Sequence, residues 1–409
     1  MNASLAHQLI TAHGSPLFAY DLDAVAARAA QLQSALPADA GLYYSFKANP
    51  LPAIARQLRL AGIGAEITSA GELHAAQNAG FSPSDMVLGG PGKSARLLKN
   101  SLQQGVRTFS CESFTDVARL STLAQAAGVE AQVLLRVNPA QAPDARLAMS
   151  GVESQFGFDE SLLLAPDAAA RLRLPHLQLR GVHVYFGTQA ASVDALARNT
   201  RCALETAARV AGALGFECEV INAGGGFPWP YASDTASEPD LSGLRAALVA
   251  AWQASPLHGR AQLCFESGRY LSAASGTLLT TVLDLKQAGK KTFVVLDTGI
   301  HHLGGMSGLG RIPRASITLQ NLTAQREGEI VADVVGPLCS PLDSLARGQK
   351  MAPVEVGDVL AVPNVGAYGL TASLTAFLSH ETPAEVAFRG TTVMEAWHLP
   401  CWHTNLCHP

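Results

Sequence analysis

The chain has 409 residues, of which 48% are hydrophobic and only 15% charged, and its formal net charge is −4. This length exceeds one typical core, so we expect a large domain and a smaller one, and the lack of a basic block argues against nucleic acid as a partner. The N-terminus lacks a signal-peptide pattern, no apolar run is long enough to span a membrane, and the seven cysteines are scattered, so we expect a cytoplasmic protein with reduced thiols.

The first 25 residues contain one β-like run, "SPLFAYDLD" (15–23). From residue 41, short β-like runs alternate with Ala/Leu-rich stretches of helical periodicity. The β-like runs are 41–47, 64–69, 86–90, 108–112, 131–138, 181–187, 218–226 and 261–267. Eight strand–helix units over roughly 230 residues predict an α/β fold, a (β/α)8 TIM-like barrel, with an open doubly wound sheet as the competing architecture.

After residue 270 the pattern becomes β-rich, with Gly, Asn and Pro between the runs and little helical periodicity. The runs are 276–287, 291–299, 315–322, 328–336 and 356–369. We therefore expect a barrel at 26–268 and a C-terminal all-β domain, a sandwich or barrel-like fold, at 269–409. Residues 1–25 would join this second domain through the N-terminal strand.

Catalytic groups of such barrels lie at the C-terminal ends of the strands. The predicted ends carry Lys47, Glu66, Arg136, residues 183–189, Gly224–Gly225–Gly226 and Glu266–Ser267–Gly268–Arg269. Bare glycine amides can approach a phosphate closely, although "GGG" also suits a tight βα turn. The carboxylate and guanidinium of "ESGRY" could equally form a structural ion pair at the domain junction.

Lys47 follows the first strand, which adjoins the eighth once a barrel closes, and phosphate sites in these barrels favour the loops after strands seven and eight. A lysine that faces a phosphate site suggests a Schiff base with pyridoxal phosphate. The pyridine nitrogen of that cofactor needs an acidic partner to stay protonated, and Glu266 is well placed for this role.

Several blocks together resemble the ordered signatures of the alanine-racemase-fold (fold-type III) pyridoxal phosphate decarboxylases, which include the diaminopimelate, ornithine and arginine decarboxylases. The blocks, found between about residues 15 and 387, are "YSFKANP", "GAEITSAGEL", "RVNP", "GVHVYFGTQ", "NAGGGFP", "ESGRY", "GPLCSPLD" and "NVGAYG". Each block alone is weak, but the joint match is specific.

The resemblance implies that Lys47 forms the Schiff base and that Glu266 pairs with the pyridinium. It implies a phosphate site made by Gly224, Gly225, Gly226, Arg269 and Tyr368 with help from Thr188, and further cofactor contacts from Glu66, Arg136, Tyr185 and Gly268. Cys339 and Asp343 would reach across a homodimer interface into a shared active site, where the cysteine returns a proton to Cα after carbon dioxide leaves. The residues expected at the substrate are Asp343, His302 and Ser340.

The sequence departs from this family at positions that bear on the substrate. Tyr185 replaces a histidine that stacks on the cofactor ring, and its aromatic ring can still stack; we expect His183 to be structural. Ser340 stands where relatives that grip a distal amino group place an acidic residue, and 297–308 lacks the arginine that binds a distal carboxylate. Free lysine, ornithine and diaminopimelate are therefore less expected than a modified amino acid, such as a citryl-amino-acid siderophore intermediate or an aminoacyl group on a carrier protein.

Two other functions compete with decarboxylation. A racemase would favour an arginine at the pyridine nitrogen, and Glu266 argues against it. A non-catalytic relative would have lost Lys47, Cys339 or Tyr368, which are all present. We expect no metal site, because the C-terminal residues His398, Cys401, His403, Cys407 and His408 fit no standard zinc spacing.

Overall fold

The computed structural model describes residues 1–140, 154–234, 237–304, 317–324, 326–401 and 403, and the backbone of Ala145–Ala148. This part of the chain groups into two compact units. The barrel unit comprises Ala26–Pro228 and Pro239–Leu271, and the β unit comprises Met1–Val25, Trp229–Glu238 and Ser272–Pro409. The domain boundaries expected from the sequence stay a prediction.

The barrel unit is a closed ring of eight parallel strands. In order around the ring they are β5 (Thr108–Cys111), β4 (Met86–Leu88), β3 (Gly64–Ile67), β2 (Gly41–Ser45), β12 (Gln262–Ser267), β11 (Val220–Asn222), β9 (Leu177–His183) and β6 (Ala131–Asn138). Pairing of β5 with β6 closes the ring, and the short β8 (Phe158–Asp159) pairs with β6 outside it. Each expected run overlaps one strand of the ring, so the barrel prediction is confirmed and an open sheet is excluded.

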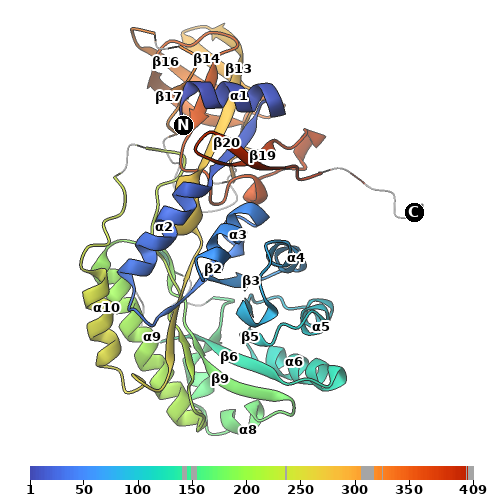
Figure 1. Cartoon of the computed structure of the whole chain (residues 1–409), viewed down its shortest axis with the longest axis vertical. Coiled ribbons are helices and arrows are strands. Elements are labelled where there is room, and N and C mark those ends of the chain that lie inside the picture. Colours follow the sequence, from blue (N-terminus) through green and yellow to red (C-terminus); the bar gives the residue numbers. More distant parts are fainter. Residues whose placement is uncertain are drawn as a thin grey trace. The chain divides into compact units, whose positions relative to one another are not determined.

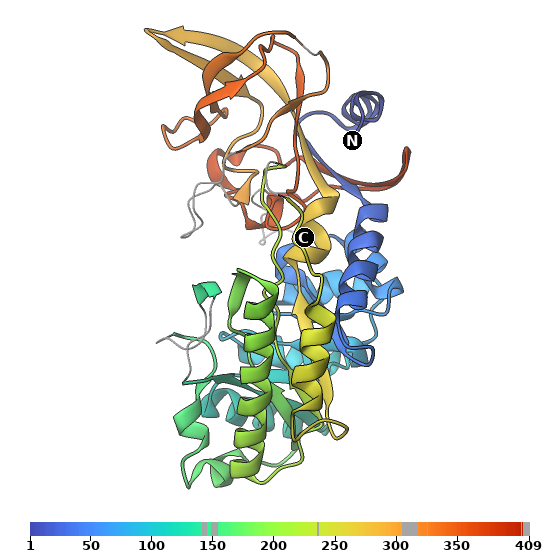
Figure 2. The same ribbon diagram turned by 90° about the vertical axis from the view of Figure 1, so that its left-hand side faces the viewer.

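Helices follow the strands and surround them (Figure 1). They are α2 (Leu22–Ala35), α3 (Pro52–Leu60), α4 (Ala70–Asn78), α5 (Ala95–Gln103), α6 (Phe114–Ala127), α7 (Glu160–Leu163), α8 (Ala168–Leu172), α9 (Val193–Leu214), α10 (Leu244–Gln253) and α11 (Arg269–Ser272). Serine side chains accept a hydrogen bond from a backbone N–H of the first turn in α4, α5, α6 and α9. Helices α9 and α10 pack side by side, as Figure 2 shows.

The β unit is built on a mixed nine-stranded sheet. Its strands are β1 (Leu17–Asp21), β13 (Gly276–Ala288), β14 (Lys291–Leu296), β15 (Gln320–Asn321), β16 (Ile330–Val335), β17 (Ser344–Met351), β18 (Val359–Val362), β19 (Ala384–Arg389) and β20 (Thr392–Trp397). β1 pairs antiparallel with β13 and parallel with β19, so the N-terminal strand joins the β domain as expected.

Some elements of the β unit were not expected from the sequence. Helix α1 (Ala3–His13) begins at Asn2, whose side chain accepts from the N–H of Leu5. Leu5 and Leu9 of this helix pack in a core with Leu17 and Val386, so burial stabilises it. Strands β17, β19 and β20 also went unpredicted. β20 alternates exposed and partly buried residues, and β17, "SLARGQKM", has a single buried residue, Leu345, so both resemble ordinary surface segments.

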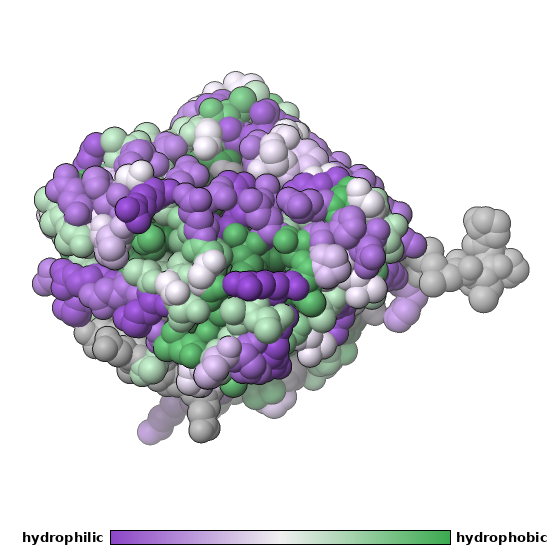
Figure 3. All heavy atoms as spheres, turned by 90° about the horizontal axis from the view of Figure 1, so that it is seen from below, coloured by the Kyte–Doolittle hydropathy of each residue, from purple (hydrophilic) through white to green (hydrophobic). Residues whose placement is uncertain are grey.

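The surface reflects the low charge content of the chain. On the face drawn in Figure 3, apolar residues form patches between polar ones. Exposed apolar side chains of the barrel unit include Leu60, Leu162 and Leu164. No helix in the described ranges has both the length and the apolar character needed to cross a membrane.

A buried carboxyl group lies where β1 meets β19. Tyr20 is fully buried, and its hydroxyl donates to Glu385 Oε1 over 2.9 Å. Glu385 is only 5% exposed. Burial raises the pKa of its carboxyl from 4.5 to about 7, although the hydrogen bond from Tyr20 opposes this shift. The folded protein therefore holds a proton there that the unfolded chain releases at lower pH.

This proton predicts a pH-dependent stability difference between the parent and Glu385→Gln. A raised carboxyl pKa contributes stability that is lost as the pH rises between 4.5 and about 7. The neutral amide escapes this loss, which corresponds to about 3 kcal/mol at most. In measurements from pH 5 to pH 8, the melting temperature of the variant should increase relative to that of the parent as the pH rises. A constant difference would contradict the raised pKa.

Candidate active site

Lys47 lies just beyond the end of β2. Tyr44 and Phe46 are buried, and the chain then turns through one 3-10 turn, Phe46–Ala48, that leaves Lys47 exposed. The hydroxyl of Tyr44 donates to the carbonyl of Asn49 over 2.7 Å and ties this turn to the strand. Lys47 Nζ lies 5.2 Å from the centroid of the Tyr185 ring. The structure thus brings the predicted Schiff-base lysine and the predicted stacking aromatic together.

The glycines after β11 and β12 allow three strand ends to approach one another closely. Gly224 and Gly226 have φ values of +69° and +98°, which side chains disfavour. A Cβ on Gly225 would collide with the carbonyl oxygen of Glu266, and a Cβ on Gly268 would lie 2.7 Å from that of Ala48. Packing alone therefore explains these glycines, and their role in phosphate binding stays a prediction.

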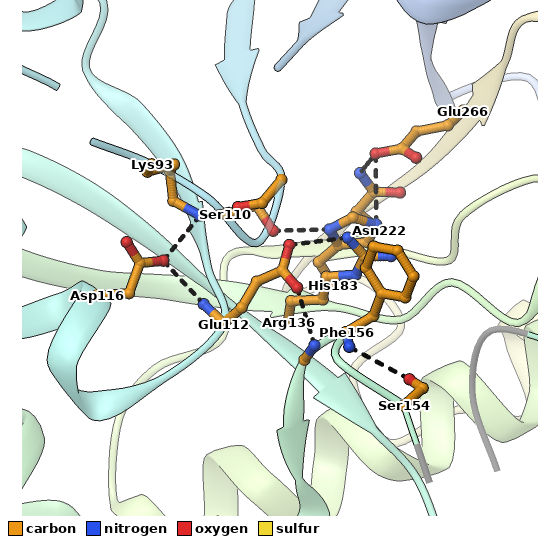
Figure 4. Close-up of polar contacts among 12 residues, drawn as sticks. Lys93, Ser110, Glu112, Asp116, Arg136, Ser154, Phe156, His183, Asn222 and Glu266 are labelled. Atoms are coloured by element: carbon orange, nitrogen blue, oxygen red, sulfur yellow. Dashed lines mark hydrogen bonds and ion pairs between the residues drawn. The ribbon is translucent and has the colours of Figure 1, made fainter. Parts of the chain in front are cut away.

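Glu266 lies at the end of β12 with 3% of its surface exposed. Its Oε1 accepts a hydrogen bond from Asn222 Nδ2 over 2.7 Å, and Asn222 Oδ1 accepts from the N–H of Gly224 over 2.9 Å. Asn222 therefore links the carboxylate to the glycine turn. His183 Nε2 lies 3.4 Å from the same Oε1, and Figure 4 shows both side chains directed toward Glu266.

His183 was expected to be structural, but it lies beside the predicted cofactor partner. Its Nδ1 is 2.8 Å from Ser110 Oγ, and the residue is 4% exposed. Burial, aided by the positive charge of Arg136, lowers the pKa of the imidazole to about 3, so the ring is neutral. The two-residue spacing between His183 and Tyr185 could have indicated this position, because alternate residues of an extended segment lie on the same face.

Arg136 is held by a buried ion pair. Its Nη1 lies 2.9 Å from Glu112 Oε1, and its guanidinium carbon is 4.9 Å from the centroid of the Phe156 ring. Glu112 Oε2 accepts from the N–H of Gly157 over 2.9 Å. The sequence placed Glu112 at the end of a predicted strand, so its position could have suggested this role.

A second buried ion pair adjoins the first (Figure 4). Lys93, only 1% exposed, lies 2.7 Å from Asp116 Oδ2. The same oxygen accepts from the N–H of Glu112 over 3.1 Å. Nothing in the sequence pattern distinguished Lys93, in the loop before α5, or Asp116, on α6, from ordinary surface residues, and both were missed.

The remaining barrel residues have different surroundings. Glu66, on β3, is 6% exposed, and its Oε2 has no hydrogen-bond partner among the described residues. Thr188 lies in β10 (Gly187–Ala190), which pairs with β7 (Ala145–Ala148). Arg269 is partly buried and begins α11 directly after the Gly268 contact.

The β unit holds the other predicted residues. Cys339 is exposed, and Ser340 is half-buried with its Oγ accepting from the N–H of Leu342 over 3.2 Å. Tyr368 is half-buried and has a φ of +55°. His302 Nδ1 lies 3.1 Å from Thr298 Oγ1. Burial lowers the pKa of His302 to about 3, with His301 contributing, so this imidazole is neutral.

Asp343 is committed to backbone groups. Its Oδ1 accepts from the N–H of Ile300 and its Oδ2 from the N–H of Leu338, each over 2.9 Å. The residue is 3% exposed, and burial raises the pKa of its carboxyl. These contacts stabilise the loop that carries Cys339, while the predicted contact of Asp343 with a substrate stays a prediction.

The C-terminal histidines and cysteines fall partly outside the described residues, which include His398, Cys401 and His403 but not Cys407 and His408. Within the ranges that the structure covers, no three His, Cys, Asp or Glu side chains are grouped as a metal site would require.

Comparison with known proteins decides the family. Residues 22–273 match the family model described as pyridoxal-dependent decarboxylase, pyridoxal binding domain. The chain belongs to this family. It is 34% identical over 383 residues to the L-glutamyl-[BtrI acyl-carrier protein] decarboxylase of Niallia circulans, covering 92% of this chain and 89% of that one. It is 30% identical to the diaminopimelate decarboxylase of Aquifex aeolicus, over 90% of this chain and 85% of that one.

A solved structure supports the same assignment over nearly the whole chain. The diaminopimelate decarboxylase of Helicobacter pylori complexed with L-lysine superposes with a TM-score of 0.82 at 26% identity and covers 95% of both chains. The chain is thus a pyridoxal phosphate-dependent decarboxylase with the fold expected from its sequence.

The residues at the strand ends fit the cofactor of this family, pyridoxal phosphate. Lys47 offers an amine to an aldehyde, and the bare backbone of Gly224–Gly226 suits a phosphate. Glu66 Oε2 is buried without a hydrogen-bond partner in the described part of the chain, so a polar group of a ligand would satisfy it.

A pair of glycine substitutions tests the packing of the strand ends. In Gly225→Ala the new Cβ collides with the Glu266 carbonyl, so we expect lower stability, by roughly 1–3 kcal/mol, and weaker cofactor binding. Gly212→Ala, the matched control on α9, meets no atom within 4 Å and should be neutral or stabilising. The melting temperature and the cofactor affinity of each variant would be compared with those of the parent protein. Equal behaviour of the two variants would refute the close packing.

Proposed function

We propose that this decarboxylase removes the α-carboxylate of an amino acid whose distal end is an uncharged acyl linkage, foremost an aminoacyl group held on a carrier protein. The main support is the similarity, over 92% of the chain, to a decarboxylase whose substrate is L-glutamyl on an acyl-carrier protein. The residues predicted to contact the substrate also suit an uncharged distal group.

The predicted substrate residues include no cation, and their one carboxyl group, Asp343, already accepts two hydrogen bonds. Ser340 is uncharged, and the low pKa of His302 keeps its imidazole neutral. Both oxygens of Asp343 already accept backbone hydrogen bonds. A distal carboxylate would lose its hydration without meeting a cation there, and a distal ammonium would meet only a carboxylate that already accepts two hydrogen bonds. Burial of either charge therefore costs more free energy than burial of an uncharged amide or thioester. Free diaminopimelate, ornithine and lysine are therefore disfavoured.

Pyridoxal phosphate supplies the electron sink that makes loss of the carboxylate feasible. In our assignment, Lys47 provides the amine that holds the cofactor, and Tyr185 packs on one face of its ring. Gly224–Gly226, Arg269 and Tyr368, with Thr188 and Gly268, would bind the phosphate. Glu266 would keep the ring nitrogen protonated, and Glu66 and Arg136 would border the ring.

Cys339 would return a proton to the carbon that loses the carboxylate. An exposed thiol suits this role only if another surface covers it during the reaction, and we propose that the partner subunit of a homodimer does so. The active site would then combine Lys47 of one subunit with Cys339 of the other.

Replacement of Lys47 tests the assignment of the cofactor amine. Lys47→Ala and Lys47→Arg should both lose turnover, because neither offers a primary amine, although arginine keeps the charge. Mass spectrometry after borohydride reduction should find the cofactor covalently attached to the parent only. Near-parent turnover with attached cofactor in Lys47→Arg would place the amine elsewhere.

A substrate panel tests the proposed function. Carbon dioxide release would be measured with glutamyl carrier protein, citrylated diamino acids, and free diaminopimelate, ornithine and lysine. We expect kcat/KM for the free diamino acids to fall at least about 100-fold below that for the best acyl-linked substrate, since unpaired buried charges discriminate strongly. The citrylated compounds, substrates in siderophore synthesis, lack the distal ammonium but add carboxylates. A free diamino acid as the best substrate would refute the proposal.

Subunit exchange tests the shared active site. Lys47→Ala and Cys339→Ala proteins, each inactive or slow, would be mixed under conditions that exchange subunits. A mixed dimer then holds one site with both defects and one with neither. Since half of the dimers are mixed at statistical exchange, about a quarter of the parent activity should return. No recovery despite demonstrated exchange would mean that each site is built from one chain.

A further inference from the structure

His183 connects Ser110, on β5, with Glu266, on β12. Its Nδ1 lies 2.8 Å from Ser110 Oγ, and its Nε2 lies 3.4 Å from Glu266 Oε1. All three side chains are at least 95% buried in the barrel unit. Neither catalysis nor cofactor binding, as assigned above, uses this histidine or the serine.

The contacts of the ring define its tautomer. A proton on Nδ1 would leave the buried Ser110 hydroxyl hydrogen without a described acceptor and turn the Nε2 lone pair toward a carboxylate oxygen. With the proton on Nε2, the serine donates to Nδ1 and Nε2–H faces Glu266. The lowered pKa of the ring agrees with this neutral form.

Both neighbours of Glu266 contact the same carboxylate oxygen. Asn222 Nδ2 and His183 Nε2 approach Oε1, at 2.7 and 3.4 Å, from β11 and β9. The 3.4 Å contact is longer than a usual hydrogen bond. It is an electrostatic attraction between the Nε2–H dipole of His183 and the carboxylate, and the low dielectric of the buried site strengthens it. Oε2 is consequently the oxygen left for a ligand.

We propose that His183 is a positioning residue that, with Ser110 fixing its tautomer, directs Nε2–H at Glu266 Oε1 and so presents Oε2 to the cofactor ring nitrogen. This inference rests on the proposed pairing of Glu266 with that nitrogen. The bond to Ser110 would then serve the orientation of His183 and not only the cohesion of the barrel.

Two amide variants separate the roles of the two ring nitrogens. The amide nitrogen of His183→Gln can occupy the position of Nε2, whereas that of His183→Asn reaches only the position of Nδ1, near Ser110. Positioning of Glu266 predicts that glutamine preserves function and asparagine does not. A purely structural bond to Ser110 predicts the opposite order. Melting temperatures of both variants, without cofactor, would verify that they fold.

The decisive measurement is the protonation of the ring nitrogen, read from the NMR shift of ¹⁵N-labelled pyridoxal phosphate bound to each protein. We expect the parent shift in His183→Gln and a shift toward the unprotonated value in His183→Asn, with kcat lower by about tenfold or more, the scale of losing an outer hydrogen-bond partner. A parent-like shift in His183→Asn, or an equal change in both folded variants, overturns the inference.

Glu266→Gln serves as the reference variant that separates the role proposed for His183 from the proposed pairing of Glu266 with the ring nitrogen. If Glu266→Gln leaves the nitrogen shift unchanged, the assignment of Glu266 itself is wrong. If Glu266→Gln changes the shift while His183→Asn does not, only the role of His183 fails.

Discussion

Parallel pairing of β12 with β2 is the constraint on which the site depends. The register sets Glu266 opposite Tyr43 and Ser267 opposite Tyr44, so the chain leaves both strands at the same end of the barrel. The turn with Lys47 and the segment from Glu266 to Arg269 are remote in sequence and become neighbours only when the ring closes. Gly268 is necessary for this approach, because a side chain there would meet Ala48.

The barrel concentrates charge in its interior although the chain as a whole is poor in charge. Lys93 with Asp116 and Arg136 with Glu112 form buried pairs that a backbone hydrogen bond joins. Buried pairs of this kind seldom stabilise a fold more than apolar residues would, because both charges lose their hydration. Their value lies in orientation, since a guanidinium held by Glu112 and packed on an aromatic ring cannot swing toward other carboxylates.

Sequence periodicity predicted the barrel well because buried parallel strands are continuous apolar runs between helices of regular length. It also predicted that Lys47 and Glu266 lie at strand ends, because the end of each apolar run indicates where a strand stops. It missed Asn222 and Ser110, whose roles depend on which neighbour each strand faces, and that register emerges only in the folded ring. Helix α1 and strand β19 were missed because they are buried against each other although they lie at opposite ends of the sequence.

Glu266 has neutral partners, and this matters for its proposed task. A cation beside the carboxylate would balance its charge and weaken its hold on a protonated ring nitrogen, as the coulombic attraction in a buried site is strong. An amide from Asn222 and a neutral imidazole from His183 fix the oxygen without adding charge. The nearby guanidinium of Arg136 is meanwhile paired with Glu112. In the proposed pairing, these neutral partners would leave the carboxylate of Glu266 to the cofactor, which would favour the electron withdrawal that decarboxylation needs.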